Sequence, residues 1–400
     1  MSILSLTAAI AAAILAAFAL AGSLYIVFFA LMGQRFARRP SANPLATPPR
    51  TRFLVLIPAH NEEASIRPTL HSLREVDYPA ELCHTVVIAD NCDDDTVGIS
   101  VKEGFECWVR TDPGARGKGH ALSWALDRAQ SLDFDAVVVL DADSTVEPGF
   151  LRAFDTAVAG GALALQSWED FEVTREGPLS VFTVASKRAE NILTWTPRQA
   201  LGLAVFLQGN GFCLRRDILS QVSWSAHSIV EDLEFSLELV LRKIPVRLVD
   251  SARLGTRAAE SAAAAFPQRL RWASGTLQLT LRYVPRLLAA AVRQRSWWLA
   301  EAAIALVLSS RPVLAYCTVV ALATSFFGLP PHLALAVWIA AAFAILLQIL
   351  YLVCVMRTVA KDRRDWLSLL SLPFYLGWLL GAQLLAALGI RRKVWARTAR

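Results

Sequence analysis

Hydrophobic positions along this 400-residue chain form two patterns: long runs near both ends and short runs in between. The long apolar runs are residues 1–34, 302–329, 332–356 and 366–390. A stretch of about 20 apolar residues is enough for a helix to cross a lipid bilayer. The pattern therefore predicts an N-terminal transmembrane anchor over residues 1–34 and a C-terminal membrane region of about three helices over residues 301–390.

Basic residues beside the apolar runs predict which side of the membrane each segment faces. Arg35, Arg38 and Arg39 follow the first run directly, and such clusters favour the cytoplasmic side. This run is longer than the roughly 7–15 residues of a signal-peptide core, which favours an uncleaved anchor. The basic tail at 391–400 also favours the cytoplasm, whereas an anchor plus three C-terminal crossings would place it outside. Charge and hydropathy therefore disagree about the C-terminal crossings.

Between the membrane segments, short apolar runs alternate with helix-like stretches. Runs typical of buried strands lie at 53–57, 85–89, 105–109 and 136–140. Stretches near 62–74 and 120–131 are predicted to be helices, and this βαβ rhythm is typical of a parallel sheet. We expect an α/β catalytic domain over residues 52–283, preceded by a basic, proline-rich linker at 35–51 and followed by an interfacial helix at 284–300.

Carboxylates follow the predicted strands at the edge where parallel α/β sheets bind ligands. Asp90 follows the second strand, and Asp141 and Asp143 follow the fourth. Acids gathered at one edge repel one another unless a cation lies between them, so Asp141 and Asp143 are candidate ligands of a divalent metal. The alternative is that such aspartates only cap the following helices. The LDADST segment also matches a phosphatase motif, but that motif normally ends a first strand rather than a fourth.

Three further segments carry candidate functional residues. Lys118 lies in a glycine-rich GARGKG segment, which lacks the spacing of a nucleoside-triphosphate-binding P-loop. Glu231 and Asp232 begin an amphipathic helical pattern, where they serve either as acids of a site or as a cap. A QRLRW segment at residues 268–272 precedes the membrane region, where basic residues can also act as interfacial anchors.

Composition favours a membrane protein over a nucleic-acid-binding protein. Hydrophobic residues make up 55% and charged residues 18% of the chain, against about 45–50% and about 25% in soluble domains. The net charge of +6 accompanies no basic patch with interleaved aromatic residues, so no nucleic-acid partner is expected. The six cysteines have no paired spacing, which predicts neither a zinc site nor a disulfide framework.

The order of these segments is more specific than any one of them. PAHNEE, Asp90, RGKGHAL, DAD, QGNGF, VED and QRLRW occur in this order between the membrane segments. In this respect residues 52–275 resemble the family-2 glycosyltransferases, the membrane group that contains cellulose, chitin and hyaluronan synthases and ceramide glucosyltransferase. The resemblance implies a GT-A fold, a Rossmann-like α/β domain. Two positions depart from the family pattern: Asp90 and its neighbours stand as Ala-Asp-Asn instead of Asp-Asp-Gly, and Val230 replaces a common threonine.

The resemblance also implies a role for each candidate residue. The residues that would bind the nucleotide sugar or border the acceptor are Ala59, Glu62, Asp90, Lys118, Asp141, Glu231, Gln268 and Trp272. Within this set, Ala59 and Glu62 would line the uridine pocket. The catalytic residues would be Asp232 as general base, Arg271 beside the leaving diphosphate, and Asp143, which with Asp141 would bind Mg²⁺ or Mn²⁺.

The implied reaction is transfer of a sugar from a UDP-sugar to a lipid-linked or growing glycan acceptor, with inversion to a β-glycosidic bond. It would take place at the cytoplasmic face of the inner membrane, on a multi-pass protein in contact with the lipid bilayer. Three or four crossings provide little for a polysaccharide channel, which favours single or limited transfer over a processive synthase. A non-catalytic nucleotide-sugar-binding subunit is the remaining alternative, and an export or assembly partner is left open.

Overall fold

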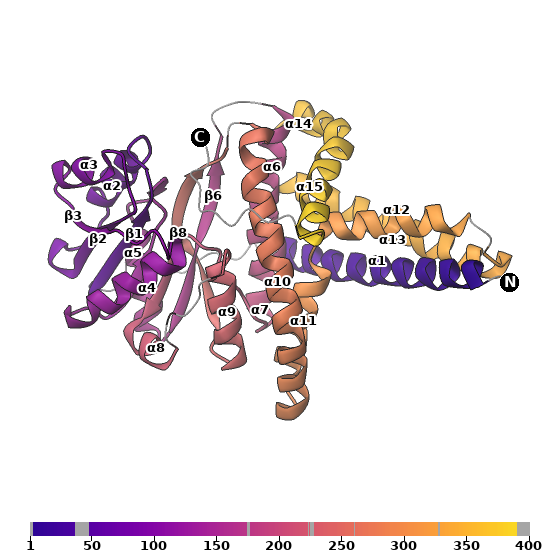
Figure 1. Cartoon of the computed structure of the whole chain (residues 1–400), viewed down its shortest axis with the longest axis horizontal. Coiled ribbons are helices and arrows are strands. Elements are labelled where there is room, and N and C mark those ends of the chain that lie inside the picture. Colours follow the sequence, from indigo (N-terminus) through magenta and orange to yellow (C-terminus); the bar gives the residue numbers. More distant parts are fainter. Residues whose placement is uncertain are drawn as a thin grey trace.

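The computed structural model describes residues 3–36, 48–173, 177–222, 224, 228–259, 261–326 and 329–389, which form an α/β domain and a group of long helices (Figure 1). The strands are β1 (Phe53–Ala59), β2 (Cys83–Asp90), β3 (Glu106–Arg110), β4 (Ala136–Val139), β5 (Ser144–Val146), β6 (Ala164–Glu172), β7 (Phe212–Arg215) and β8 (Val246–Arg257). They form one sheet in the order β3-β2-β1-β4-β7-β6-β8-β5.

The α/β domain contains eight α-helices among its described residues. These are α2 (Ile66–Arg74), α3 (Thr96–Lys102), α4 (Lys118–Arg128), α5 (Phe150–Ala159), α6 (Pro178–Glu190), α7 (Thr196–Ala200), α8 (Arg216–Gln221) and α9 (Glu231–Leu241). Short 3₁₀ turns lie at Ala80–Leu82 and Ala129–Ser131, and a π-helical turn at Asn191–Trp195 joins α6 to α7. The helices predicted near 62–74 and 120–131 are confirmed as α2 and α4.

The first half of the sheet is parallel, as the apolar runs predict. β1 pairs in parallel with both β2 and β4, and β2 pairs in parallel with β3. Every residue of β1 is buried, because α2 and α5 pack on one face of the sheet while α4 and α9 pack on the other. β7 then runs antiparallel to both β4 and β6. All four predicted strands are confirmed, and their carboxyl ends point to one edge of the sheet.

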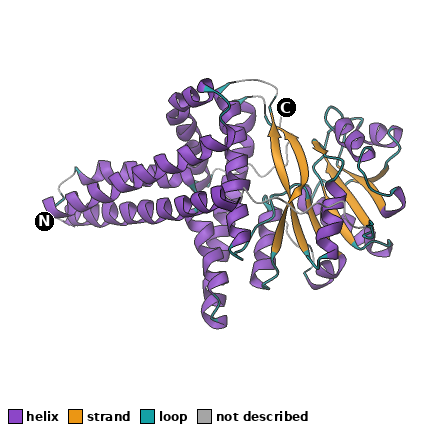
Figure 2. Cartoon of the chain, turned by 180° about the vertical axis from the view of Figure 1, so that it is seen from behind, coloured by secondary structure: helices purple, strands orange, loops and turns teal. Residues whose placement is uncertain are grey.

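The remaining helices form the second part of the molecule, and several run away from the sheet. They are α1 (Ile3–Phe36), α10 (Ala262–Gln294), α11 (Trp297–Leu308), α12 (Arg311–Ser325), α13 (Pro331–Val359), α14 (Arg363–Leu367) and α15 (Leu372–Ala387). Figures 1 and 2 show α1, α12 and α13 side by side, extending away from the α/β domain, with α10 between them and the sheet. Gln348 of α13 donates to Ser23 of α1 (3.1 Å) and Thr318 of α12 (3.0 Å), a polar contact of the kind that joins helices in lipid.

Three helical segments of the described chain are long and apolar enough to cross a membrane: residues 7–36, 331–359 and 363–387. α11 and α12 would make a fourth crossing only as one span with a 64° bend. The apolar run at 302–329 is therefore divided. Pro312 stands in the first turn of α12, where its missing backbone donor is tolerated, and this position favours a new helix start over a continued one.

The interfacial helix predicted at residues 284–300 is not a separate element. α10 continues through that boundary to Gln294 despite Pro285, and α11 begins at Trp297. The break lies at Arg295, whose positive φ of 47° ends α10 in a left-handed conformation. α10 therefore carries the QRLRW segment and residues 284–294 of the predicted interfacial segment on one continuous helix, and residues 297–300 belong to α11.

Candidate active site

A cavity of about 1340 Å³ opens at the carboxyl edge of the sheet and continues between α10 and the long helices. Its walls include all the predicted site residues except Ala59 and Asp90. These wall residues are Glu62, Lys118, Asp141, Asp143, Glu231, Asp232, Gln268, Arg271 and Trp272. Residues from the segments after β1 and β4 and from α4, α9 and α10, far apart in the sequence, thus meet in one space.

Lys118 connects the first two acidic segments of the site. It begins α4, and its ammonium group donates to the carboxylate of Asp141 and to the backbone carbonyl of Gly209. Burial by itself would lower the pKa of Lys118, but the carboxylates of Asp141, Glu231 and Asp232 outweigh it, so its pKa is raised and the group is a cation. The GARGKG segment thus supplies a fixed positive charge at the strand ends rather than a P-loop.

Glu231 and Asp232 occupy the first turn of α9, at the centre of the cavity wall. Burial, together with the neighbouring charge of Asp232, raises the pKa of Glu231 to about 7. Burial also raises the pKa of Asp232, against the opposing effect of its own backbone contacts and Lys118. The N-cap position of α9 is Val230, whose side chain cannot accept a hydrogen bond. Backbone N–H groups of the first turn act on both carboxylates and oppose the rise in their pKa. Both acids also line the cavity, which capping alone does not explain.

Gly209 explains why a glycine-rich QGNGF segment faces these acids. Its φ of +82° is a conformation that other residues rarely adopt. A methyl group at this position would lie 3.2 Å from the Oδ2 atom of Asp232, so a side chain here would crowd that carboxylate. The glycine lets the backbone approach Asp232 while its carbonyl oxygen receives the ammonium group of Lys118.

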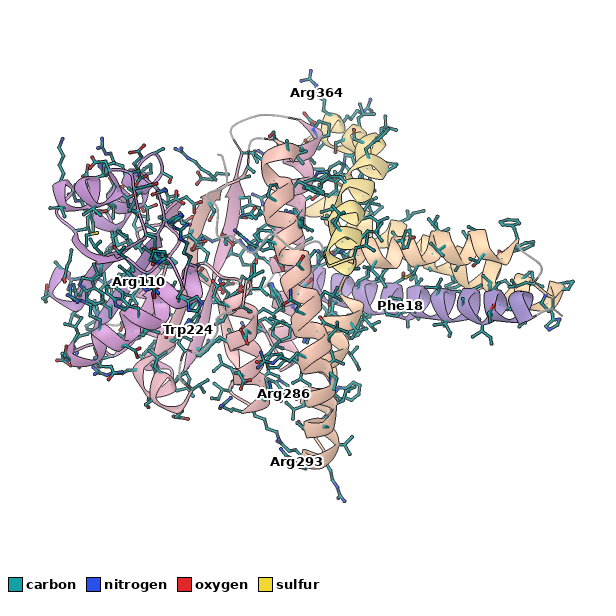
Figure 3. The ribbon with its side chains drawn as sticks, viewed as in Figure 1. Phe18, Arg110, Trp224, Arg286, Arg293 and Arg364 are labelled. Carbon is teal, nitrogen blue, oxygen red and sulfur yellow. The ribbon has the colours of Figure 1, made fainter. Side chains whose placement is uncertain are left out.

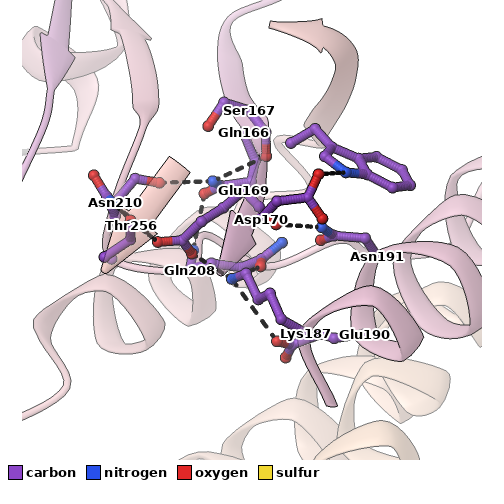
Figure 4. Close-up of polar contacts among 12 residues, drawn as sticks. Gln166, Ser167, Glu169, Asp170, Lys187, Glu190, Asn191, Gln208, Asn210 and Thr256 are labelled. Atoms are coloured by element: carbon purple, nitrogen blue, oxygen red, sulfur yellow. Dashed lines mark hydrogen bonds and ion pairs between the residues drawn. The ribbon is translucent and has the colours of Figure 1, made fainter. Parts of the chain in front are cut away.

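A buried polar network, which the sequence did not predict, holds this segment in place (Figure 4). Asn210 donates to Glu169 (2.9 Å), and its own amide oxygen accepts the backbone N–H of Asp141 (3.0 Å). Lys187 of α6 binds the same Glu169 (2.5 Å) and donates to Gln208 (2.6 Å). Both side chains of the Lys187–Glu169 pair are only 6% exposed. The network therefore connects α6, β6 and the segment after β4 that carries Asp141.

Ala59 and Asp90 lie behind the cavity wall rather than in it. The ring of His60, which does line the cavity, donates from Nδ1 to the carbonyl oxygen of Asp90 at 2.8 Å. Arg110 binds the Oδ1 atom of Asp90 at 2.5 Å, and Asp90 is fully buried. The Oδ2 atom of Asp90 accepts no hydrogen bond within the described part of the chain. A buried carboxylate oxygen without a hydrogen bond is unusual, which favours a role in accepting a hydrogen bond from a bound ligand over a purely structural role.

Arg271 lies on the face of α10 that closes the cavity. Burial lowers the pKa of its guanidinium, while the carboxylates of Glu231 and Asp141 act in the opposite direction. The guanidinium is thus largely buried and lies within the electrostatic influence of Glu231 and Asp141. Gln268 and Trp272 line the same wall, and Arg269 stacks over Trp272, 5.0 Å from the ring centroid.

We expect Arg271→Lys to lower activity about 10–100-fold. A planar guanidinium can bind a phosphate through two parallel hydrogen bonds, and loss of such a charged contact costs about 1.5–3 kcal/mol. Initial rates at several nucleotide-sugar concentrations measure the effect. Arg282→Lys, on the 62% exposed side chain of the same helix, is the matched control and should retain activity. Equal activity of both variants would favour the anchor interpretation of Arg271.

The carboxylates present suit a metal bound jointly by protein and substrate. Across the residues that the structure describes, no three His, Cys, Asp or Glu side chains are grouped to hold an ion. Asp141 and Asp143 bring two hard oxygen ligands to the cavity, and Mg²⁺ commonly binds through one or two carboxylates plus substrate phosphates. The donor set therefore fits Mg²⁺ or Mn²⁺ once a diphosphate is present.

Comparisons with known proteins identify the family and the fold of this chain. Residues 48–275 match the glycosyltransferase-like family 2. Over 259 residues the chain is 28% identical to a beta-monoglucosyldiacylglycerol synthase of Synechocystis sp., covering 60% of this chain and 50% of that protein. Over 243 residues it is 27% identical to the probable glycosyltransferase YdaM of Bacillus subtilis, covering 58% and 56%. The chain thus spans about half the length of these curated relatives.

A solved structure with a similar fold is the mannosyltransferase PcManGT from Pyrobaculum calidifontis, in complex with GDP-Man and Mn²⁺. The structural alignment covers 87% of this chain and 100% of the mannosyltransferase chain, with a TM-score of 0.54 and 19% sequence identity. The family match extends over more than half of the chain. The chain therefore belongs to glycosyltransferase family 2, and its α/β domain is a glycosyltransferase domain of the GT-A fold.

Proposed function

We propose that the protein transfers a sugar from a UDP-sugar to a lipid acceptor at the cytoplasmic face of the membrane, with inversion at the anomeric carbon. The observation that carries this proposal is the single cavity that joins two different environments. One end holds Asp143, Asp232 and Arg271, and the other is lined by apolar residues of α13 and α15. A polar reaction centre is therefore continuous with a space suited to acyl or isoprenoid chains.

The donor end of the cavity has groups for each part of a UDP-sugar. The unused Oδ2 atom of Asp90 can accept the ring N–H of uracil if the base reaches past His60. Arg271 would bind the diphosphate from α10, and Asp141 and Asp143 would hold the Mg²⁺ or Mn²⁺ ion that neutralises part of the diphosphate charge. Lys118 keeps Asp141 oriented at the strand end.

Asp232 would act as the general base of the transfer. It takes the proton of the acceptor hydroxyl as that oxygen forms a bond to the anomeric carbon on the face opposite the diphosphate. The bond from the anomeric carbon to the diphosphate oxygen breaks, and UDP leaves with the electron pair. Arg271 stabilises the negative charge that develops on this leaving group. An α-linked donor would then give a β-glycoside.

The acceptor end supports a lipid rather than a long polysaccharide. Its wall contains Ile349 and Leu352 from α13 and Leu376, Leu379 and Leu380 from α15. A hydrophilic polymer gains nothing from such a surface, whereas a lipid chain loses no favourable hydration there. We therefore favour single or limited transfer to a membrane lipid.

The proposal is tested with purified protein in liposomes of the host's lipids, incubated with each of a panel of radiolabelled UDP-sugars. We expect label from at least one UDP-sugar in the organic extract and none in insoluble polymer. GDP-mannose serves as the donor control, and the Asp232→Asn variant as the enzyme control. Label only in insoluble polymer would show a processive synthase, and absence of transfer from every UDP-sugar would contradict the proposed donor.

We expect Asp143→Asn to weaken the binding of UDP in the presence of Mg²⁺ or Mn²⁺ about tenfold or more. The substitution removes one of two carboxylates that balance the metal charge. UDP titration by calorimetry, with metal and with chelator, measures the effect. In the chelator arm wild type and variant should bind UDP almost equally. Metal-independent UDP affinity and transfer in the wild type would exclude Asp141 and Asp143 as metal ligands.

A further inference from the structure

The segment at residues 363–387 is long and apolar enough to cross a membrane, but the basic residues on both sides of it argue against a crossing. Arg357, Lys361, Arg363 and Arg364 precede it, and the RRKVWARTAR tail follows it. A crossing would place these two basic groups on opposite sides of the membrane. Because basic residues beside membrane helices concentrate on the cytoplasmic side, the pattern disfavours that arrangement.

Both halves of α15 pack against elements of the glycosyltransferase domain or of the helix that closes its cavity. In the first half, Tyr375 stacks on Phe182 of α6 at 4.9 Å, and Trp378 lies 5.8 Å from Phe266 of α10. In the second half, Ala382 and Ala386 are buried in one cluster with Leu270 of α10. Leu270 adjoins Arg271, so the last turns of α15 lie at the level of the active site.

Figures 1 and 2 show the same arrangement from opposite sides: α15 runs along α10 and across the direction of α1 and α13. Figure 3 shows Arg293 of α10 and Arg364 of α14 pointing outward at opposite ends of this layer. If α1 and α13 cross the bilayer, α10 and α15 must therefore run parallel to the membrane plane. Basic residues at the rim of such a layer suit the headgroup region.

The composition of α15 determines how deep it lies. Phe374 is 82% exposed and Leu388 is 75% exposed, although both are large and apolar. Among the described residues of α15, Gln383 is the one with a polar amide, and it donates to Ser310 at 3.0 Å. A helix without a polar face cannot rest on the membrane surface with one side in water. It is stable only when lipid covers the sides that α10 leaves open.

We infer that α15 lies inside the cytoplasmic leaflet, parallel to the membrane plane, and does not cross the bilayer. The partner of its exposed face is the acyl-chain layer of that leaflet, and its inner face is a wall of the acceptor cavity. The C-terminal end of α15 and the basic tail after it then remain on the side of the glycosyltransferase domain. This inference rests on the membrane placement that the proposed function assumes.

Cysteine accessibility tests the sidedness. Single variants Ala396→Cys in the basic tail, His332→Cys and Glu81→Cys are exposed to a membrane-impermeant maleimide in intact and in permeabilised cells, and labelled peptides are identified by mass spectrometry. His332 lies between α12 and α13, and Glu81 lies on the glycosyltransferase domain. We expect only His332→Cys to be labelled in intact cells and all three after permeabilisation.

Two different results would overturn the inference and are distinguishable. Labelling of Ala396→Cys together with His332→Cys in intact cells would show that α15 crosses the membrane, with the proposed function intact. Protection of His332→Cys in intact cells would contradict the membrane placement of α12 and α13 itself. Wild-type transfer activity of each variant confirms that its fold is preserved.

Depth measurements test the orientation of the helix independently of sidedness. Spin labels at residues 374 and 388 are separated by 14 positions, or about 21 Å along a helix axis. Collision with lipid-dissolved oxygen and a water-soluble nickel complex reports the depth of each label in liposomes. We expect similar depths within one leaflet for both labels. Depths that differ by about 20 Å would overturn the in-plane orientation.

Discussion

Replacement of Asp232 by asparagine is expected to lower turnover about 10²–10⁴-fold, the effect of losing a general base. The amide is almost isosteric with the carboxylate and keeps an oxygen that can accept the backbone N–H of Leu233, so folding and UDP-sugar affinity should change little. The amide cannot accept the proton of the acceptor hydroxyl near neutral pH. Transfer rate and UDP-sugar binding by calorimetry, measured on one preparation, separate the chemical step from binding.

The neighbouring acid provides the matched control. Glu231→Gln removes the adjacent carboxylate, which lies in the same helix turn and also has a raised pKa. We expect this variant to retain most of the turnover. If Glu231→Gln shows the large loss and Asp232→Asn does not, the base is Glu231. Unchanged turnover in both variants would remove the α9 acids from the mechanism.

The pH dependence of activity is an independent test of Asp232 as the general base. Burial raises the pKa of Asp232, and a base must be ionised to accept a proton. Activity should therefore rise with pH through this raised pKa and level off above it, with the loss on the acid side beginning at a higher pH than an ordinary aspartate would give. Asp232→Asn should flatten this limb of the wild-type profile.

The parallel half of the sheet could be predicted because its sequence signal is local. β1 and the segment Val86–Ala89 of β2 are apolar runs that are fully buried, and such runs can be recognised without knowledge of distant partners. The other half is different. β5 is three residues long, and β8 alternates buried with exposed positions and pairs with both β6 and β5. Their pairing depends on the tertiary fold, so local patterns do not reveal it.

Candidate site residues could be predicted from the sequence where they follow the end of a strand or begin a helix. Asp141, Asp143 and Asp232 come directly after a strand or open a helix, and topology brings such ends to one edge. The Lys187–Glu169 pair gives no such signal, because Lys187 stands within a helix and Glu169 within a strand. What makes this pair part of the site is burial and contact with Gln208, which arises only when α6 docks on β6.

For the candidate membrane helices, too, the sequence signal is incomplete. Hydropathy identifies the apolar runs, but it depends on composition alone and does not give the orientation of a helix relative to the membrane. Whether a run crosses the bilayer depends on its packing partners, and α15 packs lengthwise on α10 through Leu270 and Ala382. The conflict between charge and hydropathy in the sequence thus disappears if one apolar helix lies in the membrane plane.

Removal of Arg198 is expected to destabilise the protein by about 3–5 kcal/mol, because it leaves a carboxylate buried without its partner. Arg198 of α7 is 1% exposed and binds both carboxylate oxygens of Glu301 in α11, at 2.8 and 2.7 Å. Tyr25 of α1 donates to the same Glu301 at 2.7 Å. One ion pair thus joins the glycosyltransferase domain, the N-terminal helix and α11.

The test compares Arg198→Leu with the double variant Arg198→Leu/Glu301→Leu and with Arg242→Leu, which removes a 45% exposed partner of Glu238. Unfolding in mixed micelles is followed by tryptophan fluorescence.

We expect the double variant to recover most of the loss, since both charges are gone and a buried pair can often be replaced by apolar residues. Arg242→Leu should cost about 1 kcal/mol or less, as exposed pairs do. If Arg198→Leu costs no more than Arg242→Leu, the buried pair does not hold α1 and α11 to the glycosyltransferase domain. If the double variant is as unstable as Arg198→Leu, charge balance is not what stabilises this junction. The hydrogen bonds that Arg198 donates to Tyr25 and to the carbonyl oxygen of Ala204, which leucine cannot replace, then account for the loss.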